Sequence, residues 1–379
     1  MTVIDLPQRG RATHTPFKIE LFTGDNLAAA QWPAITDSRD LKMYAFQSRE
    51  FLEVWLNTIG KAGRIETYLI VVKDGDGRPL LHLPLAIETK FNVRLLRFTD
   101  CGVADYNAPI LTAGCDLSRQ DFHRLWTDIL ALLPSVDVID LKKIAGEIAG
   151  VRNPLTYLDC EPDNENGHAI SLRGLRDQSV APHPSIRQRR KLRQCAKELS
   201  KLGAPTFITN PDADDLEHVT ERLLELKRDK YRRTATPDFL AAPGVEAFYR
   251  AMMNPNQLGR ISHLSALTVN GTVASAHLGF IGRGRFYYIL PAYDTAFSRY
   301  RVGHQLLQHL IDRSVAQNFD SFDLGVGDMP YKDIWATQHL ALYVHERAMT
   351  AAGRLYLQMR RLRRFVKSSG VRTWFRTAS

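Results

Sequence analysis

The sequence predicts an α/β protein of the α+β type, with a mixed sheet in each of two similar lobes that follow one another in the chain. Each half of the 379 residues shows a helix, an antiparallel hairpin, a further helix and a strand in the same order. A hydrophobic fraction of 44% and a charged fraction of 24% are typical of a globular protein. The length suffices for two lobes with ample cores. An open mixed sheet covered by helices follows from this order of elements.

The N-terminal lobe is expected over residues 17–165, after a flexible lead-in of residues 1–16. Apolar periodicity identifies its elements, and Asp-Gly pairs at 74–77 mark the turn between its first two strands. A loop over 101–109 shows no regular pattern. The expected elements are a helix over 37–59, strands over 66–72, 80–87 and 94–98, a helix over 117–133 and a strand over 136–141.

The C-terminal lobe is expected over residues 166–350, followed by a basic amphipathic helix over 351–379. The lobe starts with a strand over 168–172 and a very basic helix over 185–202, which a Gly-Ala-Pro sequence terminates. The elements expected after it are a strand at 207–208, helices over 212–232 and 244–253, strands over 261–269, 272–281 and 285–291, a helix from 298, a short strand near 322 and a strand over 339–349.

The hairpin of the C-terminal lobe and the helix after it suggest a site for an anionic ligand. A helix N-terminus presents free backbone N–H groups and the positive end of the helix dipole, so it can hold a phosphate. Gly303 in this helix start lets the backbone approach a ligand, and Arg299 and Arg301 add positive charge. His304 fits either a phosphate contact or a surface position. An ordinary helix start is the alternative for the whole segment.

At these residues the sequence resembles the GNAT (GCN5-related) acyltransferase superfamily. Within it, the resemblance is to the two-lobed bacterial group of BioF2-like, cellulose-biosynthesis-associated (CelD-type) proteins and Fem-type transferases, over roughly residues 40–350. The residues that carry it are the hairpin, the Tyr293-Asp294 loop, the helix at Gly303 and the run Asp323-x-Gly-x-Gly-x-x-x-Tyr331-Lys332. The family's Gln/Arg-x-x-Gly-x-Gly/Ala signature for the pyrophosphate is incomplete, because Tyr300 and Gln305 stand at two of its positions.

The resemblance implies where an acyl group is transferred. Members place the acyl thioester in a gap between two central strands, expected here at 272–281 and 285–291. His277 in the first of these strands is the expected general base, because imidazole titrates near neutral pH. A buried, hydrogen-bonded histidine is the alternative.

The other site residues also follow from the resemblance. Lys332 matches the lysine of the family's Tyr-Lys pair, which contacts the donor in Fem-type members. It is therefore expected to be catalytic together with His277, and an exposed lysine after a turn is the alternative. Tyr293 and Tyr331 are expected at the substrate. Asp105 and Tyr106 match a loop at the interface between the lobes and are expected to bind the acceptor, with an Asx-type turn as the alternative. No metal and no permanently bound cofactor are expected; acyl-CoA or an acyl carrier protein is the donor substrate.

The net charge of +9 is concentrated at the C-terminus. Residues 351–379 contain eight basic residues and no acidic one, which leaves about +1 on the first 350 residues. One apolar stripe of this helix consists of Leu355, Met359, Leu362 and Val366, and Trp374 and Phe375 follow it. Arginines beside an apolar stripe predict a helix that lies on an anionic lipid surface, and docking onto the protein is the alternative.

The remaining charge lies mainly on the basic helix over 185–202. This helix is expected either to line a groove between the lobes, where it attracts an anionic substrate, or to form a solvated face. Nucleic acid is not expected as a partner, because the body is nearly neutral and shows no signature of a nucleic-acid-binding fold.

Several absences predict a cytoplasmic protein, and the basic C-terminal helix suggests a peripheral position at the inner face of the membrane. The apolar runs are too short to span a bilayer, and the N-terminus lacks the hydrophobic region of a secretory signal. The four cysteines are widely spaced, which favours free thiols.

These observations predict an N-acyltransferase that moves an acyl group from acyl-CoA or acyl carrier protein to an amine. If the tail binds membrane, a sphingoid or amino-lipid base is a natural acceptor. The alternatives are O-acylation in exopolysaccharide or cellulose synthesis, Fem-type aminoacyl transfer, and a non-catalytic scaffold of a polysaccharide synthase. The absence of a long inserted coiled coil disfavours the Fem-type activity.

Overall fold

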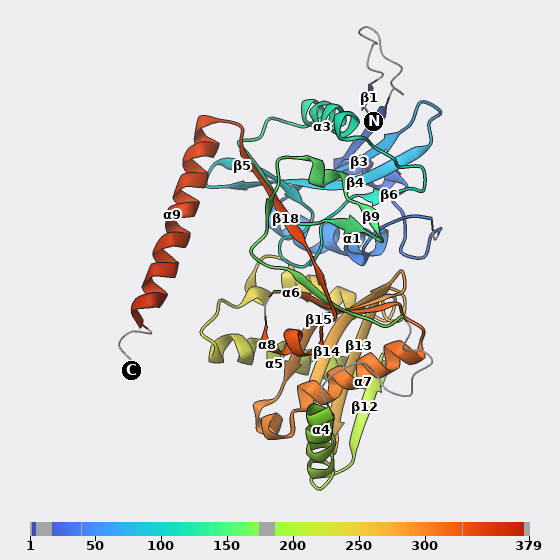
Figure 1. The fold of residues 1–379 in the computed structure, drawn as a ribbon, viewed down its shortest axis with the longest axis vertical. Helices are drawn as coiled ribbons and strands as arrows, with labels where there is room; N and C mark the ends of the chain where they lie inside the picture. The colour runs from blue at the N-terminus through green and yellow to red at the C-terminus, as the bar shows by residue number, and fades with distance from the viewer. Residues whose placement is uncertain (1, 5–16, 39, 174–185, 328, 375–379) are drawn as a thin grey trace.

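Two large β-sheets, one for each lobe, form the framework of the computed structural model (Figure 1). The structure describes residues 2–4, 17–38, 40–173, 186–327 and 329–374. Within these residues, the first sheet has nine strands and the second has seven. The α/β fold with two tandem lobes and mixed sheets, predicted from the sequence, is confirmed.

The N-terminal lobe is built on the first sheet, whose strand order is β1-β2-β3-β4-β5-β7-β18-β10, with β6 paired to β4. Its strands are β1 (Thr2–Ile4), β2 (Lys18–Thr23), β3 (Glu66–Lys73), β4 (Pro79–Lys90), β5 (Val93–Phe98), β6 (Ile110–Leu111), β7 (Val138–Ala145), β10 (Glu161–Pro162) and β18 (Leu342–Ala348). Its helices are η1 (Gly24–Ala30), η2 (Ala45–Gln47), α1 (Arg49–Trp55), η3 (Leu56–Gly60), α2 (Lys61–Gly63), α3 (Arg119–Leu132) and η4 (Pro154–Tyr157). A small separate hairpin consists of β8 (Glu147–Ile148) and β9 (Val151–Arg152).

The C-terminal lobe is built on the second sheet, in the order β12-β13-β14-β15-β16-β11-β17. Its strands are β11 (Gly167–Ser171), β12 (Pro205–Thr209), β13 (Ser262–Val269), β14 (Thr272–Gly282), β15 (Arg285–Tyr293), β16 (Ser321–Val326) and β17 (Gln338–Leu340). Its helices are α4 (Ile186–Leu199), α5 (Ala213–Arg233), η5 (Phe239–Ala241), α6 (Val245–Met252), η6 (Thr295–Tyr300), α7 (Val302–Ala316) and α8 (Pro330–Trp335). Leu224 of α5 and Leu310 of α7 belong to different apolar clusters, so these helices cover opposite faces of the β14–β15 hairpin.

Two strand segments run side by side from one lobe into the other. Pro162 of β10 pairs with Tyr343 of β18 in the first sheet, and Gly167 of β11 pairs with Leu340 of β17 in the second. The sequence placed one strand over 339–349 in the C-terminal lobe. In the structure its larger part, β18, lies in the sheet of the N-terminal lobe, because the edge of β7 offers backbone groups for pairing.

Two elements near the N-terminus also differ from the prediction. The helix expected over 37–59 starts only at Arg49, where the hydroxyl of Ser48 accepts a hydrogen bond from the N–H of Phe51 and caps the helix. In the expected lead-in, Thr2–Ile4 form β1 and pair with β2. The rest of that lead-in, residues 5–16, lies outside the described residues.

One aromatic core crosses the boundary between the lobes. Phe46 and Phe51 of the N-terminal lobe approach Phe280 at ring-centroid distances of 6.0 and 5.7 Å. Phe51 also contacts Phe248 at 5.1 Å, and Phe46 contacts Tyr287 at 5.2 Å. Buried aromatic contacts of this kind contribute strongly to stability. The two lobes therefore share a core instead of meeting at a polar surface.

The C-terminal helix α9 (Ala351–Trp374) starts beside β18 and runs along one flank of the molecule (Figure 1). In the part of the chain that the structure describes, no helix has both the length and the apolar character needed to cross a membrane. Cys101, Cys115, Cys160 and Cys195 are free thiols, as the sequence predicted.

Candidate active site

β15 and β16 start as parallel neighbours and then separate. Their pairing comprises three residue pairs and ends at Tyr287↔Asp323. Beyond this point, residues 288–293 of β15 keep β14 on one side and pair with no described strand on the other. We call this gap the strand opening. The sequence placed it between β14 and β15 instead, but these strands are joined by a short turn and stay paired along their length, whereas β15 and β16 are joined through α7.

A cavity of about 630 Å³ lies at the strand opening, and we call it the C-terminal cavity. It is bordered by β15, the start of α7, the end of α5 and α8. Its charged and titratable lining includes Lys230, Arg233, Arg301, His304 and Tyr331, and none of the described residues that line it is acidic. The cavity is therefore suited to an anionic ligand.

Most residues that the sequence assigned to donor binding meet at this cavity. Arg301, Gly303 and His304 line it, together with Tyr293. Arg299 does not, because its guanidinium donates to the hydroxyl of the neighbouring Tyr300 and lies over that ring at 4.6 Å. Residues 299–304 are close together in the sequence at one helix start, but only some of them line the cavity, and the side chain of Arg299 does not.

The start of α7 leaves its backbone donors without a capping side chain. The N-cap residue Arg301 has a left-handed backbone conformation (φ 54°) and makes no side-chain cap. A Cβ on Gly303 would lie 3.5 Å from Cδ1 of Tyr293, which is an ordinary contact distance. Packing within the protein therefore does not require glycine there, and its missing side chain leaves room in the C-terminal cavity. Burial and the nearby Arg301 lower the pKa of His304, so this imidazole is neutral at pH 7.

Asp105 reaches from the N-terminal lobe into the strand opening. A Cβ on Gly325 would lie 2.5 Å from Oδ2 of Asp105 and 3.6 Å from the carbonyl oxygen of Tyr288. The carboxylate thus stands between β16 and β15, where it accepts a hydrogen bond from the N–H of Val326. Asp105 as a whole remains partly exposed to solvent. The sequence assigned Asp105 to the acceptor, and this position beside the strand opening is compatible with that role.

The surroundings of Asp105 make its carboxylate a stronger base than an ordinary one. Burial and the charge of Asp323 raise its pKa to about 6, while Lys143, Lys332 and the N–H of Val326 oppose that rise. Lys332 is itself buried, and its Nζ donates to the carbonyl oxygen of Val326 at 2.8 Å. At neutral pH, Asp105 is therefore mostly ionised and able to accept a proton.

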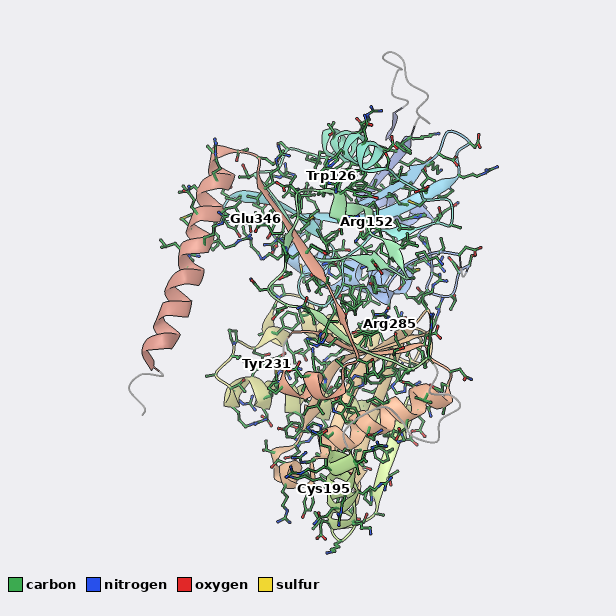
Figure 2. The ribbon with its side chains drawn as sticks, in the orientation of Figure 1. Trp126, Arg152, Cys195, Tyr231, Arg285 and Glu346 are labelled. Carbon is green, nitrogen blue, oxygen red and sulfur yellow. The ribbon has the colours of Figure 1, made fainter. Side chains whose placement is uncertain are left out.

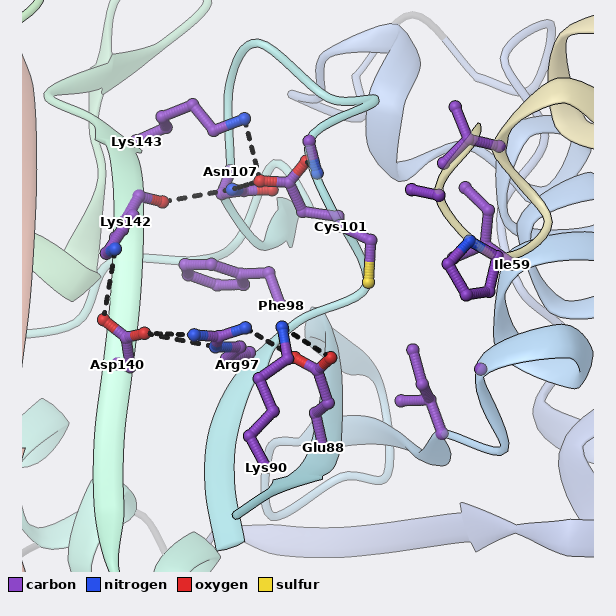
Figure 3. A pocket seen from close by; sticks show the side chains of 17 residues that line it. Ile59, Glu88, Lys90, Arg97, Phe98, Cys101, Asn107, Asp140, Lys142 and Lys143 are labelled. Carbon is purple, nitrogen blue, oxygen red and sulfur yellow. Dashed lines mark hydrogen bonds and ion pairs between the residues drawn. The ribbon is translucent and has the colours of Figure 1, made fainter. Parts of the chain in front are cut away.

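A second cavity, of about 400 Å³, lies where β5 and β7 of the N-terminal lobe separate. Ala242, Pro243 and Val245 of the C-terminal lobe also line it, and Figure 3 shows its lining. Here Nζ of Lys143 lies 2.8 Å from Oδ2 of Asp100 and also donates to the carbonyl oxygen of Ala104. Asn107 donates to the same Asp100 carboxylate at 3.2 Å. These contacts fix the loop immediately before and after Asp105. Further ion pairs of this cavity are Arg97–Asp140, Arg97–Glu88 and Lys90–Glu88.

Tyr106 joins the two lobes and does not line the C-terminal cavity. Its hydroxyl donates to Oδ1 of Asp323 at 2.8 Å, and Oδ2 of the same carboxylate lies 2.7 Å from Nη1 of Arg285. Tyr106 and Asp323 are both fully buried. Figure 2 shows Arg285 at the boundary between the lobes. The acceptor-binding role expected for Tyr106 is therefore not supported by its position, which is that of a structural link.

His277 is buried in β14 and does not line the C-terminal cavity. Its ring stacks on Tyr288 at 4.2 Å, and neither ring nitrogen has a hydrogen-bond partner among the described residues. Burial lowers the pKa of His277 well below its usual value. The burial of His277 fits the alternative of a buried histidine better than the general base expected from the sequence, but the hydrogen bonds of that alternative are not formed among the described residues.

Lys227 was not identified from the sequence, although it lies on the apolar face of α5 with Leu223 and Leu224. Its Nζ donates to the carbonyl oxygen of Pro291, a cavity residue of β15, at 3.4 Å. Among the described residues it has no carboxylate partner, and burial together with Lys230 lowers its pKa to about 7. The sequence contains one signal that could have identified Lys227, because this lysine stands at a position where the periodicity of α5 predicts an apolar residue.

A known family model matches most of the C-terminal lobe. Residues 187–333 match the family model described as an acetyltransferase (GNAT) domain. This range contains β15, β16, the start of α7 and most of the C-terminal cavity. No curated protein matches the chain in sequence.

Two solved structures share the fold of this chain at low sequence identity, and a third is less similar. A crystal structure of FemX has a TM-score of 0.53 and 11% identity, covering 83% of this chain and 93% of the other. A conserved protein of unknown function from Bacteroides thetaiotaomicron VPI-5482 has a TM-score of 0.51 and 11% identity, covering 84% and 94%. A tandem GNAT protein from the clavulanic acid biosynthesis pathway has a TM-score of 0.45 and 11% identity, covering 86% and 98%.

Proposed function

We propose that this chain, whose residues 187–333 form an acetyltransferase domain of the GNAT family, transfers an acyl group from a thioester donor to an amine. The observation that carries the proposal is the meeting of three features at one strand opening: an uncapped helix start, a cationic cavity and a carboxylate of raised pKa. Each supplies one requirement of acyl transfer from CoA or a carrier protein.

The C-terminal cavity supplies the donor side. Phosphate groups are stabilised by the backbone N–H groups of a helix start and by cationic side chains around it. The start of α7 at Gly303 and the side chains of Arg301, Lys230 and Arg233 meet these conditions at the cavity. The unpaired edge of residues 288–293 lies next to them, where a strand backbone can bind the thioester arm and its carbonyl oxygen.

Asp105 supplies the acceptor side. The amine nitrogen attacks the thioester carbonyl carbon, the C–S bond breaks, and an amide and a thiolate form. Asp105 accepts the proton that the amine loses and returns it to the thiolate. Its pKa of about 6 suits this exchange near neutral pH, because the carboxylate is ionised yet more basic than usual. Lys332 and Val326 hold this region of β16 in place.

The acceptor we propose is an amine carried by a lipid. Leu355, Met359 and Leu362 of α9 are 57%, 47% and 63% exposed, and they form one stripe. The opposite face of α9 packs against the N-terminal lobe, since Leu357 is buried and Nη1 of Arg360 lies 2.8 Å from Oδ2 of Asp140. The apolar stripe is therefore left for a partner, and anionic lipid complements the arginines beside it. The side chains of Val366 and Trp374, and Phe375 as a whole, lie outside the described residues.

The β4–β5 turn adds a second apolar group on this side of the molecule. Phe91 is 82% exposed, and the guanidinium of Arg363 lies 5.9 Å from its ring centre. An exposed aromatic ring beside a cationic helix is typical of a headgroup contact. These side chains support an acyl acceptor located in the membrane surface, such as a sphingoid or amino-lipid base.

The proposal is tested with Asp105→Asn, measured by thiol release from short- and long-chain acyl-CoA with a panel of lipid and soluble amines. We expect kcat to fall by roughly two to four orders of magnitude, because proton transfer by a positioned base contributes that much. In the unmodified protein, kcat/KM should fall as the pH drops through about 6, where Asp105 becomes protonated. The variant should not show this decrease at acidic pH.

Asp312→Asn is the matched control, since it removes a different carboxylate of raised pKa, which belongs to the C-terminal lobe and lies outside the cavity. It should leave kcat unchanged. If the Asp105→Asn protein is fully active and the His277→Gln protein is inactive, the general base is His277 and not Asp105. Turnover with aminoacyl-tRNA but with no acyl-CoA would replace the proposal with Fem-type transfer.

A further inference from the structure

α4 carries a concentrated positive charge at the end of the C-terminal lobe that is remote from the N-terminal lobe (Figure 1). Its 14 residues, Ile186–Leu199, include six arginines and lysines. Its single acidic residue, Glu198, pairs with Lys201 at 2.7 Å. The helix therefore does not line a groove between the lobes, which was one of the two positions expected from the sequence.

The inner face of α4 belongs to the region of the C-terminal cavity. Gln188 lines that cavity, and Leu192 borders a small adjoining space with Arg301 and His304. Cys195, labelled in Figure 2, contacts the carbonyl oxygen of Arg299 at 3.8 Å. The basic helix is thus attached directly to the start of α7, where we place the phosphate of the donor.

The outer face of α4 carries the charge. At about 100° per residue, Arg190, Arg193 and Lys197 lie on the side opposite Gln188 and Leu192. All three are exposed, and within the described residues none of them pairs with a carboxylate. They point away from the cavity, so a ligand inside the cavity cannot reach them. A charged surface that has no carboxylate partner among the described residues and borders a ligand site is suited to a partner that stays outside.

We propose that the outer face of α4, defined by Arg190, Arg193 and Lys197, is the docking surface for an acyl carrier protein, a small acidic protein that holds its acyl chain as a phosphopantetheine thioester. The inference rests on the proposed function and specifies its donor. A carrier-bound thioester lacks the adenosine phosphates of CoA, so its enzyme gains affinity from the acidic surface of the carrier. The phosphopantetheine arm enters beside Gln188 and reaches the edge of β15. The acyl carbon then bonds to the amine nitrogen, the C–S bond breaks, and the carrier thiol leaves with a proton.

The dimensions of this surface favour a protein helix over a nucleic acid. α4 is about 21 Å long, so one acidic helix of about the same length can pack alongside it. A nucleic-acid-binding domain is typically strongly basic as a whole. The first 350 residues carry only about +1 in total, so the positive charge of α4 is local.

The test compares two donors with the same acyl chain, a purified acyl carrier protein and CoA, in the full chain and in the variant Arg190→Glu/Arg193→Glu/Lys197→Glu. We expect KM for the acyl carrier protein to rise at least tenfold with little change in kcat, and KM for acyl-CoA to stay within twofold. A matched variant, Lys61→Glu/Arg64→Glu/Arg124→Glu, reverses three exposed charges of the N-terminal lobe and should alter neither value.

Binding of the holo carrier protein, measured by calorimetry, tests the surface without turnover. Binding that the α4 variant loses and the N-terminal variant keeps supports the inference, even if no thioester is turned over and the proposed function fails. Equal binding by both variants overturns the inference, even if acyl-CoA is a good donor. An equal rise of KM for both donors also overturns it, because the patch then serves the nucleotide of CoA. Competition by tRNA at lower concentration than the carrier protein would assign the surface to RNA instead.

Discussion

Lys227 lies at a position where a positive charge is costly. Burial lowers its pKa to about 7, below the value near 10.4 of an unfolded chain. Between these two pH values the folded protein binds fewer protons than the unfolded chain, so the free energy of unfolding should rise with pH from about 7 to about 10. Lys227→Met should remove this dependence and raise the melting temperature at pH 7.

The measurement is denaturation at pH 7 and pH 10, with exposed Lys201→Met as the control. If Lys227→Met lowers the stability at pH 7, the buried amine makes a favourable contact beyond its 3.4 Å hydrogen bond to Pro291. A loss of turnover without a loss of stability would add Lys227 to the reaction.

Gly303 is the residue at which donor binding can be tested without harm to the fold. A Cβ there meets Tyr293 at an ordinary 3.5 Å, so valine is compatible with the packing but projects into the C-terminal cavity. Gly303→Val should weaken acyl-CoA binding by more than tenfold, about 1.4 kcal/mol. Calorimetry with acyl-CoA checks this. Gly114→Val, at a glycine where an added Cβ would have no neighbouring atom within 4 Å, should bind normally. A folded Gly303→Val protein of unchanged affinity would mean that the phosphate lies elsewhere.

At the scale of elements, α9 combines two faces with different partners. Leu357 packs with Leu95 and Val138, while Leu355, Met359 and Leu362 remain exposed. Deleting the helix would therefore disturb the N-terminal lobe as well as any lipid contact. Replacing only the three exposed side chains by serine should abolish co-sedimentation with anionic vesicles and leave the melting temperature unchanged.

Binding of the unmodified protein to vesicles should weaken at high salt, because the arginines of α9 act within a Debye length of the lipid surface. Gln358→Ser is the control for the helix, since Gln358 is exposed and is not one of the apolar residues of the stripe. Vesicle binding that survives the triple serine change would remove α9 from the membrane contact and with it the reason for a lipid acceptor.

At the scale of the whole molecule, the two lobes are joined by a shared aromatic core and by the contact between Tyr106, Asp323 and Arg285. The Tyr106 hydroxyl is a donor to a buried carboxylate, a kind of hydrogen bond that contributes about 1.5–3 kcal/mol. Tyr106→Phe should lower the melting temperature yet leave a single calorimetric transition, because the core still spans both lobes. Two separate transitions would show that each lobe unfolds alone.

Local patterns in the sequence predicted the elements and one side of the site. The β14–β15 hairpin and α7 follow from apolar spacing and short turns, which act over a few residues. Arg301, Gly303, His304 and Tyr293 meet at one cavity because a single strand–helix connection carries them. Arg299 belongs to the same run, but its contact with Tyr300 depends on a side-chain direction that spacing does not specify.

Tertiary structure alone decided how distant segments meet. Asp105 and Gly325 are separated by more than 200 residues, and their contact depends on how the lobes pack. β18 pairs with β7 because backbone hydrogen bonding is nearly independent of sequence, so neighbouring strands are chosen by the packing of the whole chain. Burial likewise gives Lys227 and His277 their properties, since desolvation depends on every surrounding element. The sequence by itself therefore determined the fold class and the helix start at the cavity, and the packing of the lobes determined which carboxylate and which amine stand beside the strand opening.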